Sequence, residues 1–279
     1  MLARVFQQAA GIGDALLARL GPSSAIAAQR RGLGERDHRP WPLPRGPWVQ
    51  GQTWLDLLFA HWPLPVDDLR PAVPAALPLD TFDGRAWLGI TPFEVIGLRV
   101  QGTPPVPGIS RFPETNVRTY TTVDGKPGIH FFSLDAANAL AVTGARATYR
   151  LPYRRAEMAI QRTGEEIRYR TRRAEPEAEL VARYRPDGPV FQPQPGTLEH
   201  FLTERYCLYV VDKHHDVRRA DIHHPPWPLQ PAIAHIERNT MTAPIGIELP
   251  GDPLLHFAAR QDVLIWPLGP PDRQGSRGS

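Results

Sequence analysis

The sequence predicts a mainly β domain of the α+β class, in which many short strands form a closed or nearly closed barrel beside a few short helices. Prolines number 32 in 279 residues, which disfavours long helices. Short segments bounded by proline and glycine alternate apolar and polar residues with the period of two typical of strands. Neither a repeat of 20–50 residues nor a Gly/Ser linker divides these segments, so one domain is expected.

The N-terminal residues read differently from the rest. Residues 1–37 carry apolar side chains at roughly helical spacing, interrupted by Gly11 and Gly13. We interpret them as an extension, helical or disordered, that packs loosely; a helix that binds a partner or a membrane surface is the alternative. The barrel domain is expected over residues 38–268, followed by a disordered tail over 269–279.

The clearest element is a hairpin from Asn116 to Ser133. Side chains alternate along a strand, so Val117 and Thr119 share one face of its first strand, and Asn116 and Arg118 share the other. A turn rich in Asp, Gly and Pro follows at residues 124–128.

The same pattern predicts other strands and one helix. The helix begins at Leu198, ends near Arg205 and is capped by Thr197. In chain order, the further strands are Ala86–Thr91, Arg146–Leu151, Glu166–Arg172, Glu179–Arg185, Leu208–Val211, Ile233–Arg238 and Leu264–Trp266.

Composition narrows the range of partners and compartments. The chain has 32 Lys and Arg against 29 Asp and Glu, a net charge of +3 that is too weak to indicate nucleic acid. A single cysteine excludes an internal disulfide and favours the cytoplasm. No run reaches the roughly 20 apolar residues of a membrane span, and no secretory signal is recognisable. Composition leaves the oligomeric state open.

Glu114 and Arg118 are the first candidate site residues. Lying four residues apart, they share a strand face if the strand already includes Glu114, which brings a carboxylate and a guanidinium to one surface. Such a pair orients an acid or holds an anionic substrate. A structural ion pair at the rim of the barrel explains the pattern equally well.

A second candidate region runs from Gly144 to Arg155. Arg146 and the phenol of Tyr153 could recognise a carboxylate or phosphate and donate a proton. Alternation also allows the arginines here to lie on a solvated face, and the same reading is preferred for Arg168, Arg170 and Arg172.

Histidines form the third group, at His214, His215, His223 and His224, with His130 on the hairpin. Adjacent histidines on a strand point to opposite faces, so one of each pair at most reaches a common centre. No zinc-binding spacing such as HExxH is present. Packing is favoured over a metal site, and one inward histidine is an acid-base candidate.

Tryptophans and prolines form the fourth group, and they line an apolar pocket or build the core. The tryptophans concerned are Trp41, Trp48, Trp54, Trp62 and Trp227. The motifs of nucleotide-binding proteins, α/β-hydrolases and CxxC proteins are missing, so no cofactor and no metal is predicted.

Several runs together resemble the YqjF-like family of bacterial domains of unknown function. The resemblance covers nearly everything from Arg39 to Leu268. The matching runs, in order, are RPWPLPRGPW, LLFAHWPLP, LRPAVPAALPLDTFDGRAWLG, PETNVRTYTTVDGKPGIHFFSLDA, ARATYRLPY, LTERYCLY and IHHPPWPLQPA.

That family is similar in fold to acetoacetate decarboxylase, which implies an antiparallel β-barrel with a few short helices. The pocket of that enzyme holds a Schiff-base lysine in a motif of the form G-R-E, two residues, G, an aromatic residue, P, K, K. Here Tyr153 and Arg154 stand where the lysine pair would lie. A phenol forms no imine, so the decarboxylase mechanism is not expected to carry over. Lys126 and Lys213, the only lysines, lie in turns and are poor substitutes.

The sequence therefore predicts a barrel whose pocket carries Glu114 and Tyr153 as proton-moving residues. Arg118 or Arg146 would hold the anion of a carboxylate-bearing or oxygenated small molecule. The weaker ligand-binding candidates are His130, His223 and His224. The alternatives are a binding module without catalysis and a metal-dependent hydrolase that uses the histidine region.

Overall fold

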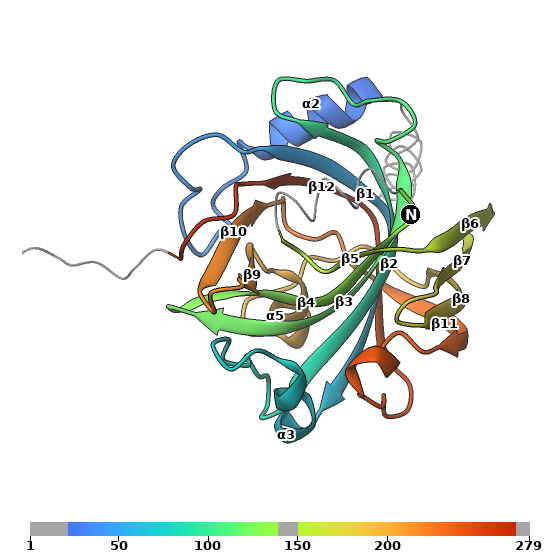
Figure 1. The fold of residues 1–279 in the computed structure, drawn as a ribbon. Coiled ribbons are helices and arrows are strands. Elements are labelled where there is room, and N and C mark those ends of the chain that lie inside the picture. Colours follow the sequence, from blue (N-terminus) through green and yellow to red (C-terminus); the bar gives the residue numbers. More distant parts are fainter. Residues whose placement is uncertain (1–21, 139–149, 272–279) are drawn as a thin grey trace, which may run out of the picture.

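The computed structural model describes residues 22–138 and 150–271, and its centre is a closed ring of strands (Figure 1). Each strand pairs with the next around the ring, and the last pairs again with the first. The prediction of a mainly β fold with few short helices is confirmed. In order around the ring the strands are β1 (Gln50–Leu64), β2 (Ala86–Val100), β3 (Phe112–Val123), β4 (Lys126–Ala136), β9 (Cys207–Val211), β10 (Val217–His223) and β12 (Leu254–Ile265).

Strands β3 and β4 form the predicted hairpin. Asp124 and Gly125 join them with φ angles of 51° and 71°, the left-handed pair of a type I′ turn. Most pairings are antiparallel, but β4 runs parallel to β9 and to the short strand β5 (Tyr153–Arg155). Phe132 on β4 has no partner on β3, and this bulge lies directly opposite Val117 and Arg118.

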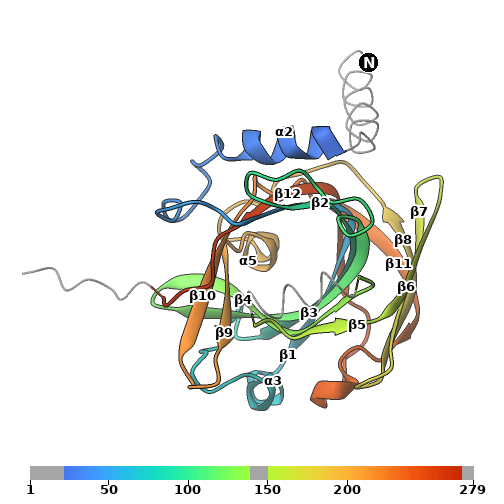
Figure 2. The same ribbon diagram turned by 45° about the horizontal axis from the view of Figure 1, so that its top comes forward.

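A four-stranded sheet extends from one side of the ring (Figure 2). It consists of β6 (Glu157–Thr163), β7 (Glu166–Arg173), β8 (Ala178–Pro186) and β11 (Gln230–Asn239), and β11 joins it to β12. Burial alternates strictly along β7, where Arg168, Arg170 and Arg172 are exposed. The solvated face predicted for these arginines is confirmed.

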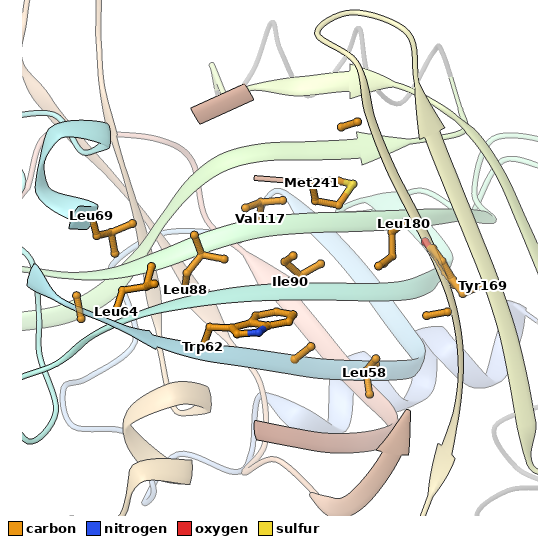
Figure 3. Close-up of a cluster of buried hydrophobic side chains, with 14 of the residues drawn as sticks. Leu58, Trp62, Leu64, Leu69, Leu88, Ile90, Val117, Tyr169, Leu180 and Met241 are labelled. Atoms are coloured by element: carbon orange, nitrogen blue, oxygen red, sulfur yellow. The ribbon is translucent and has the colours of Figure 1, made fainter. Parts of the chain in front are cut away.

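The apolar core has two main parts, and β1 contributes to both. Leu57 belongs to the cluster inside the ring, whereas Leu58 belongs to the cluster between the ring and the side sheet. Figure 3 shows this second cluster, with Leu180 and Tyr169 from the side sheet among side chains of β1, β2 and β3. Strands β1 to β3 are therefore covered on both faces.

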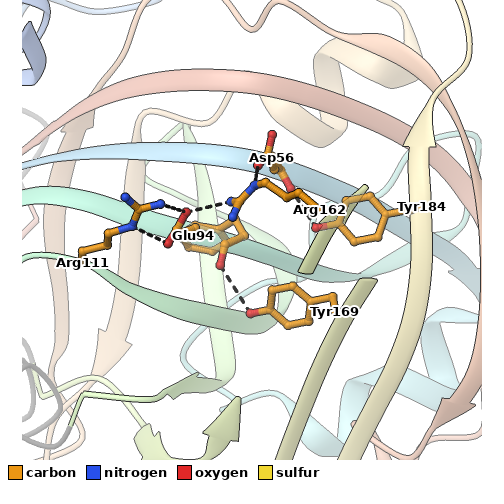
Figure 4. Close-up of polar contacts among 7 residues, drawn as sticks. Asp56, Glu94, Arg111, Arg162, Tyr169 and Tyr184 are labelled. Atoms are coloured by element: carbon orange, nitrogen blue, oxygen red, sulfur yellow. Dashed lines mark hydrogen bonds and ion pairs between the residues drawn. The ribbon is translucent and has the colours of Figure 1, made fainter. Parts of the chain in front are cut away.

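Polar contacts also join the two sheets (Figure 4). Arg162 of β6 donates to Asp56 of β1 at 2.6 Å and to Glu94 of β2 at 2.7 Å. Arg111 donates to both oxygens of the same Glu94 carboxylate. Tyr184 of β8 donates its hydroxyl proton to the carbonyl of Asp56 at 2.8 Å.

The helices are short and lie around the ring. The helix α5 (Leu198–Thr203) begins after Thr197, whose hydroxyl accepts from the amide of His200, so the predicted cap is confirmed. The others are α2 (Pro22–Gly32), α3 (Val66–Leu69), η1 (Arg70–Ala72) and η2 (Ala243–Ile245). Among the described residues, no helix has the length and apolar character needed to cross a membrane.

The described part of the N-terminal segment packs on the ring through α2. Gln29 is 1% exposed and accepts a hydrogen bond from Arg99 at 2.8 Å. A Cβ atom at Gly51 would lie 2.5 Å from the Gln29 side-chain oxygen, so a larger residue on β1 would displace the Gln29 amide. Most of the predicted strand Arg146–Leu151 falls outside the described residues.

A buried ion pair between Arg173 and Asp135 links β7 to β4, and it yields a stability prediction. The two side chains are 2% and 0% exposed. Arg173→Met leaves the carboxylate without its cation and should lower the free energy of unfolding by about 3–5 kcal/mol at neutral pH. Arg172→Met on the exposed face of the same strand is the matched control and should change it by less than about 0.5 kcal/mol. Urea unfolding of both variants tests this, and equal effects would contradict it.

Candidate functional site

A cavity of about 50 Å³ lies inside the ring. One water needs roughly 10–15 Å³ of such space, so the cavity accommodates a few waters or a small organic molecule. Its wall is largely apolar, with polar groups gathered on β3 and on the segments after α5 and β10. The lining residues are Gln52, Trp54, Leu57, Thr91, Phe93, Glu114, Asn116, Arg118, Ile129, Phe131, Leu134, Leu151, Tyr153, Thr203, Arg205, Leu208, Ile222, His224, Trp227 and Ile265.

Strand β3 presents a row of three polar side chains to the cavity. Glu114, Asn116 and Arg118 alternate with Val117, which points into the core on the other face. Tyr169 of the side sheet donates its hydroxyl proton to the carbonyl of Glu114 at 2.8 Å. The side sheet thus supports the strand from behind at the position where the acid lies.

Glu114 is a buried carboxyl that holds its proton at neutral pH. It is 3% exposed, and burial raises its pKa to about 8. Hydrogen bonds from Asn116 and Tyr153 oppose this shift without cancelling it. The phenol oxygen of Tyr153 lies 3.2 Å from a carboxyl oxygen of Glu114. Glu114 and Tyr153, both expected in the pocket, are thus in direct contact within the cavity wall.

Arg118 is a buried cation without an acidic partner in the described part of the chain. It is 5% exposed, and one terminal nitrogen donates to the Leu202 carbonyl at 3.2 Å and to the Tyr120 hydroxyl at 3.4 Å. Its guanidinium lies 5.3 Å from the centre of the Phe59 ring. Glu114 and Arg118 share a strand face as expected, but they form no ion pair with each other.

The histidine pair separates as strand alternation predicts. His224 lines the cavity, and its ring nitrogens lie 2.8 Å from the Pro225 carbonyl and 3.3 Å from the Arg205 carbonyl. His223 faces α2 instead, where its Nε2 lies 2.7 Å from the Gly32 carbonyl. Burial lowers the pKa of both rings, that of His223 to about 4, so both are neutral at pH 7.

The remaining candidates lie elsewhere. His130 is not among the residues that line the cavity, and its Nδ1 lies 3.3 Å from the Tyr209 carbonyl. Arg146 falls outside the described residues. Both lysines are described and neither lines the cavity: Lys126 starts β4 beside the ring of Trp41, and Lys213 is exposed in a turn.

The described side chains of the histidine region are not grouped as ligands of a metal ion. Across residues 22–138 and 150–271, no group of three or more His, Cys, Asp or Glu side chains is arranged to hold a metal ion. The metal-dependent hydrolase therefore has no support from the described side chains.

Asn116 and Arg205 are polar cavity residues that were not considered as site residues from the sequence. Asn116 was placed on the correct face of its strand but was not considered as a ligand group, although alternation from Glu114 to Arg118 passes through it. Arg205 reaches the cavity from the segment after α5, where no periodic pattern marks it. Trp227, one of the tryptophans expected to line a pocket or build the core, reaches it from the segment after β10. Arg205 is already paired, since it donates to Asp80 at 2.6 Å.

Comparison with known proteins assigns the family. The profile of the DUF2071 family, described as "Uncharacterized conserved protein", matches residues 51–262. The chain belongs to this family. The uncharacterized protein YqjF of Bacillus subtilis (strain 168) is 49% identical over 228 residues, which are 81% of this chain and 94% of that protein. The predicted family resemblance is confirmed.

Solved structures share the fold of this DUF2071 member at low sequence identity. The enduracididine biosynthesis enzyme MppR complexed with pyruvate is 11% identical, with a TM-score of 0.57 that covers 84% of this chain and 92% of that one. Acetoacetate decarboxylase from Legionella pneumophila is 10% identical, with a TM-score of 0.55 covering 83% and 92%. The predicted decarboxylase-like fold is confirmed, and at these identities the likeness concerns the fold alone.

The raised pKa of Glu114 predicts how stability varies with pH. Between pH 4.5 and about 8 the folded protein keeps a proton on Glu114 that the unfolded chain has lost. The stability of the native protein relative to Glu114→Gln should therefore fall as pH rises through this range, by up to about 1.4 kcal/mol per unit, and level off above it. Urea unfolding of both proteins from pH 5 to 9 measures the difference. A difference that is constant or rises with pH would contradict the assignment.

Proposed function

We propose that this DUF2071 protein binds a small carboxylate-bearing compound inside the ring and that Glu114 exchanges a proton with it. The observation that carries the proposal is the buried guanidinium of Arg118, which has no acidic partner among the described residues and lies on the same wall as a protonated carboxyl. A buried cation without a counter-ion is costly, and a bound anion would reduce that cost.

The proposed reaction uses Arg118 and Glu114, the two ends of the row of polar side chains on β3. Arg118 would hold the carboxylate of the ligand by charge-assisted hydrogen bonds. Glu114 would give its proton to an oxygen or carbon of the ligand as its own O–H bond breaks. The carboxylate left behind would be stabilised by the hydrogen bonds from Tyr153 and Asn116, which favour the charged form of Glu114.

The structures with the same fold support the class of ligand. One of them is an MppR complex with pyruvate, a three-carbon acid of the size that this cavity accommodates. That support is by analogy of fold. The alternative is a binding module without catalysis, in which Glu114 only shapes the wall.

The role of Arg118 is tested by binding. Isothermal titration with pyruvate, propionate and lactate should show saturable binding to the native protein. Arg118→Met removes the only unpaired cation of the described cavity wall and should weaken that binding by about tenfold or more. Arg155→Met, which removes an exposed charge from β5, is the control and should leave the affinities unchanged. Equal losses of affinity in the two variants would refute the proposal that Arg118 holds the carboxylate of the ligand.

Catalysis and binding are separated by Glu114→Gln. The amide keeps the shape of the side chain but has no acidic proton, so the variant should bind the same acids and lose at least about a hundredfold in turnover of any acid that the native protein converts. A panel of small acids followed by NMR supplies the turnover assay. If the native protein binds acids and converts none, the binding module is the correct function.

The lack of a cavity lysine makes a further prediction about mechanism. Borohydride reduction in the presence of pyruvate traps an imine as a stable mass increase on a lysine. We expect no such adduct on Lys126 or Lys213, because neither lines the cavity. Mass spectrometry of the treated protein checks this, with an acetoacetate decarboxylase as the positive control. A stoichiometric adduct on either lysine would overturn the mechanism without an imine.

A further inference from the structure

Three side chains in the cavity wall carry a buried polar atom without a hydrogen-bond partner. They are the side-chain oxygen Oδ1 of Asn116, the Nε of Arg118 and the indole Nε1 of Trp227. A buried polar group without a partner has lost its hydrogen bonds to water, which costs free energy. A ligand that supplies the missing partner removes this cost and gains affinity from it. The three atoms therefore describe the hydrogen bonds that a ligand must make: two acceptors and one donor.

The two unpaired donors lie around one aromatic ring. The guanidinium of Arg118 is 5.3 Å from the centre of Phe59, and the ring of Trp227 meets Phe59 edge-on at 4.8 Å. Both side chains line the same cavity of about 50 Å³, so a carboxylate bound there can accept from either donor. They indicate where the anionic end of the ligand lies.

The unpaired acceptor belongs to Asn116, which lies between Glu114 and Arg118 on the cavity face of β3. Its oxygen Oδ1 is buried and has no donor among the described residues. A ligand that only accepts hydrogen bonds cannot satisfy it.

We propose that the ligand is a small hydroxy acid, whose carboxylate accepts from Arg118 Nε and Trp227 Nε1 and whose hydroxyl donates to Asn116 Oδ1. This inference rests on the carboxylate site proposed above and adds the hydroxyl. An amino acid also supplies a donor, but its ammonium would lie beside the buried guanidinium of Arg118 and opposite a carboxyl that is neutral at pH 7. A hydroxyl meets neither obstacle.

Strand geometry sets the order of the groups. Successive residues on one face of a strand are separated by about 6.6 Å, twice the rise of about 3.3 Å per residue. The row therefore reads guanidinium, amide, carboxyl from Arg118 through Asn116 to Glu114. The hydroxyl of the ligand lies next to its carboxylate, and Glu114 reaches the part of the molecule beyond the hydroxyl.

Four acids with three carbons test the inference: lactate, pyruvate, propionate and alanine. They differ mainly in a hydroxyl, ketone, methylene or ammonium at one carbon. Isothermal titration of the native protein should give the tightest binding for lactate, by about three- to tenfold over pyruvate and propionate, the value of one neutral hydrogen bond. Asn116→Leu should remove this preference and leave the affinity for propionate within about twofold.

Two further variants serve as controls. Trp227→Phe removes the indole N–H and should weaken the binding of lactate, pyruvate and propionate by a similar factor of about three to ten. Thr203→Val also changes a cavity residue, but the Thr203 hydroxyl already donates to the Glu199 carbonyl, so the preference for lactate should persist.

The outcomes distinguish this inference from the proposed function. Equal binding of lactate, pyruvate and propionate, or a preference for alanine, would overturn the hydroxy acid and leave the carboxylate site intact. A preference for lactate that survives Asn116→Leu would show that Asn116 does not recognise the hydroxyl. No binding of any of the four acids would overturn both proposals.

Discussion

The site depends on one constraint: β3 keeps an acid and a cation apart inside a closed ring. Glu114 and Arg118 lie on the same face of the strand, but four residues of extended chain separate their Cα atoms by about 13 Å. They form no ion pair, so neither neutralises the charge of the other. Glu114 becomes neutral by keeping its proton, whereas a guanidinium does not lose its own at neutral pH. The cavity therefore carries a neutral acid at one end of the row and a positive charge at the other.

The side sheet keeps β3 in this arrangement. Tyr169 donates to the Glu114 carbonyl from behind the strand, and the hydroxyl of Thr115 donates to Tyr169 at 3.1 Å. Arg162, Glu94 and Asp56 form a second connection between the two sheets. A strand that is covered on both faces is shielded from water. This shielding disfavours the charged forms of its ionisable groups relative to the neutral forms. The side sheet thus contributes to the chemistry of the cavity through the burial it provides.

Side-chain alternation and turn residues were sufficient to predict the β3–β4 hairpin and the faces of its first strand. The Asp124–Gly125 turn marks the β3–β4 hairpin, and the period of two placed Arg118 and Val117 on opposite faces. The strand predicted from the sequence ended at Thr91, directly before Pro92, and was therefore shorter than β2. In the structure β2 continues through Pro92, where the pairing of β1 with β2 is interrupted and part of the ladder that proline would break is absent.

Local sequence patterns did not predict the elements and residues whose positions depend on long-range contacts. β1 was not predicted, because its many buried positions and its bend at Asp56, with a φ angle of 53°, hide the alternation. Arg205 and Trp227 enter the wall only because β9 and β10 bring distant segments beside β4 and β12. The family resemblance supplied the location of the pocket, and neither resemblance nor pattern identified Asn116 as a ligand group.

The tyrosine beside Glu114 has two consequences for the pocket. A phenol forms no imine, so covalent activation of a ketone by that side chain is lost. A protonated lysine at the same distance from Glu114 would also have favoured the ionised carboxylate, whereas the neutral hydroxyl of Tyr153 leaves burial as the dominant influence on its pKa. With Tyr153 at this position, the pocket has no nucleophilic amine beside Glu114, and Glu114 keeps a proton to give. A pocket of this kind favours acid-base chemistry on a ligand held by its charge, and for this reason the position of Arg118 matters more to the proposed function than the fold that the DUF2071 chain shares with the decarboxylases.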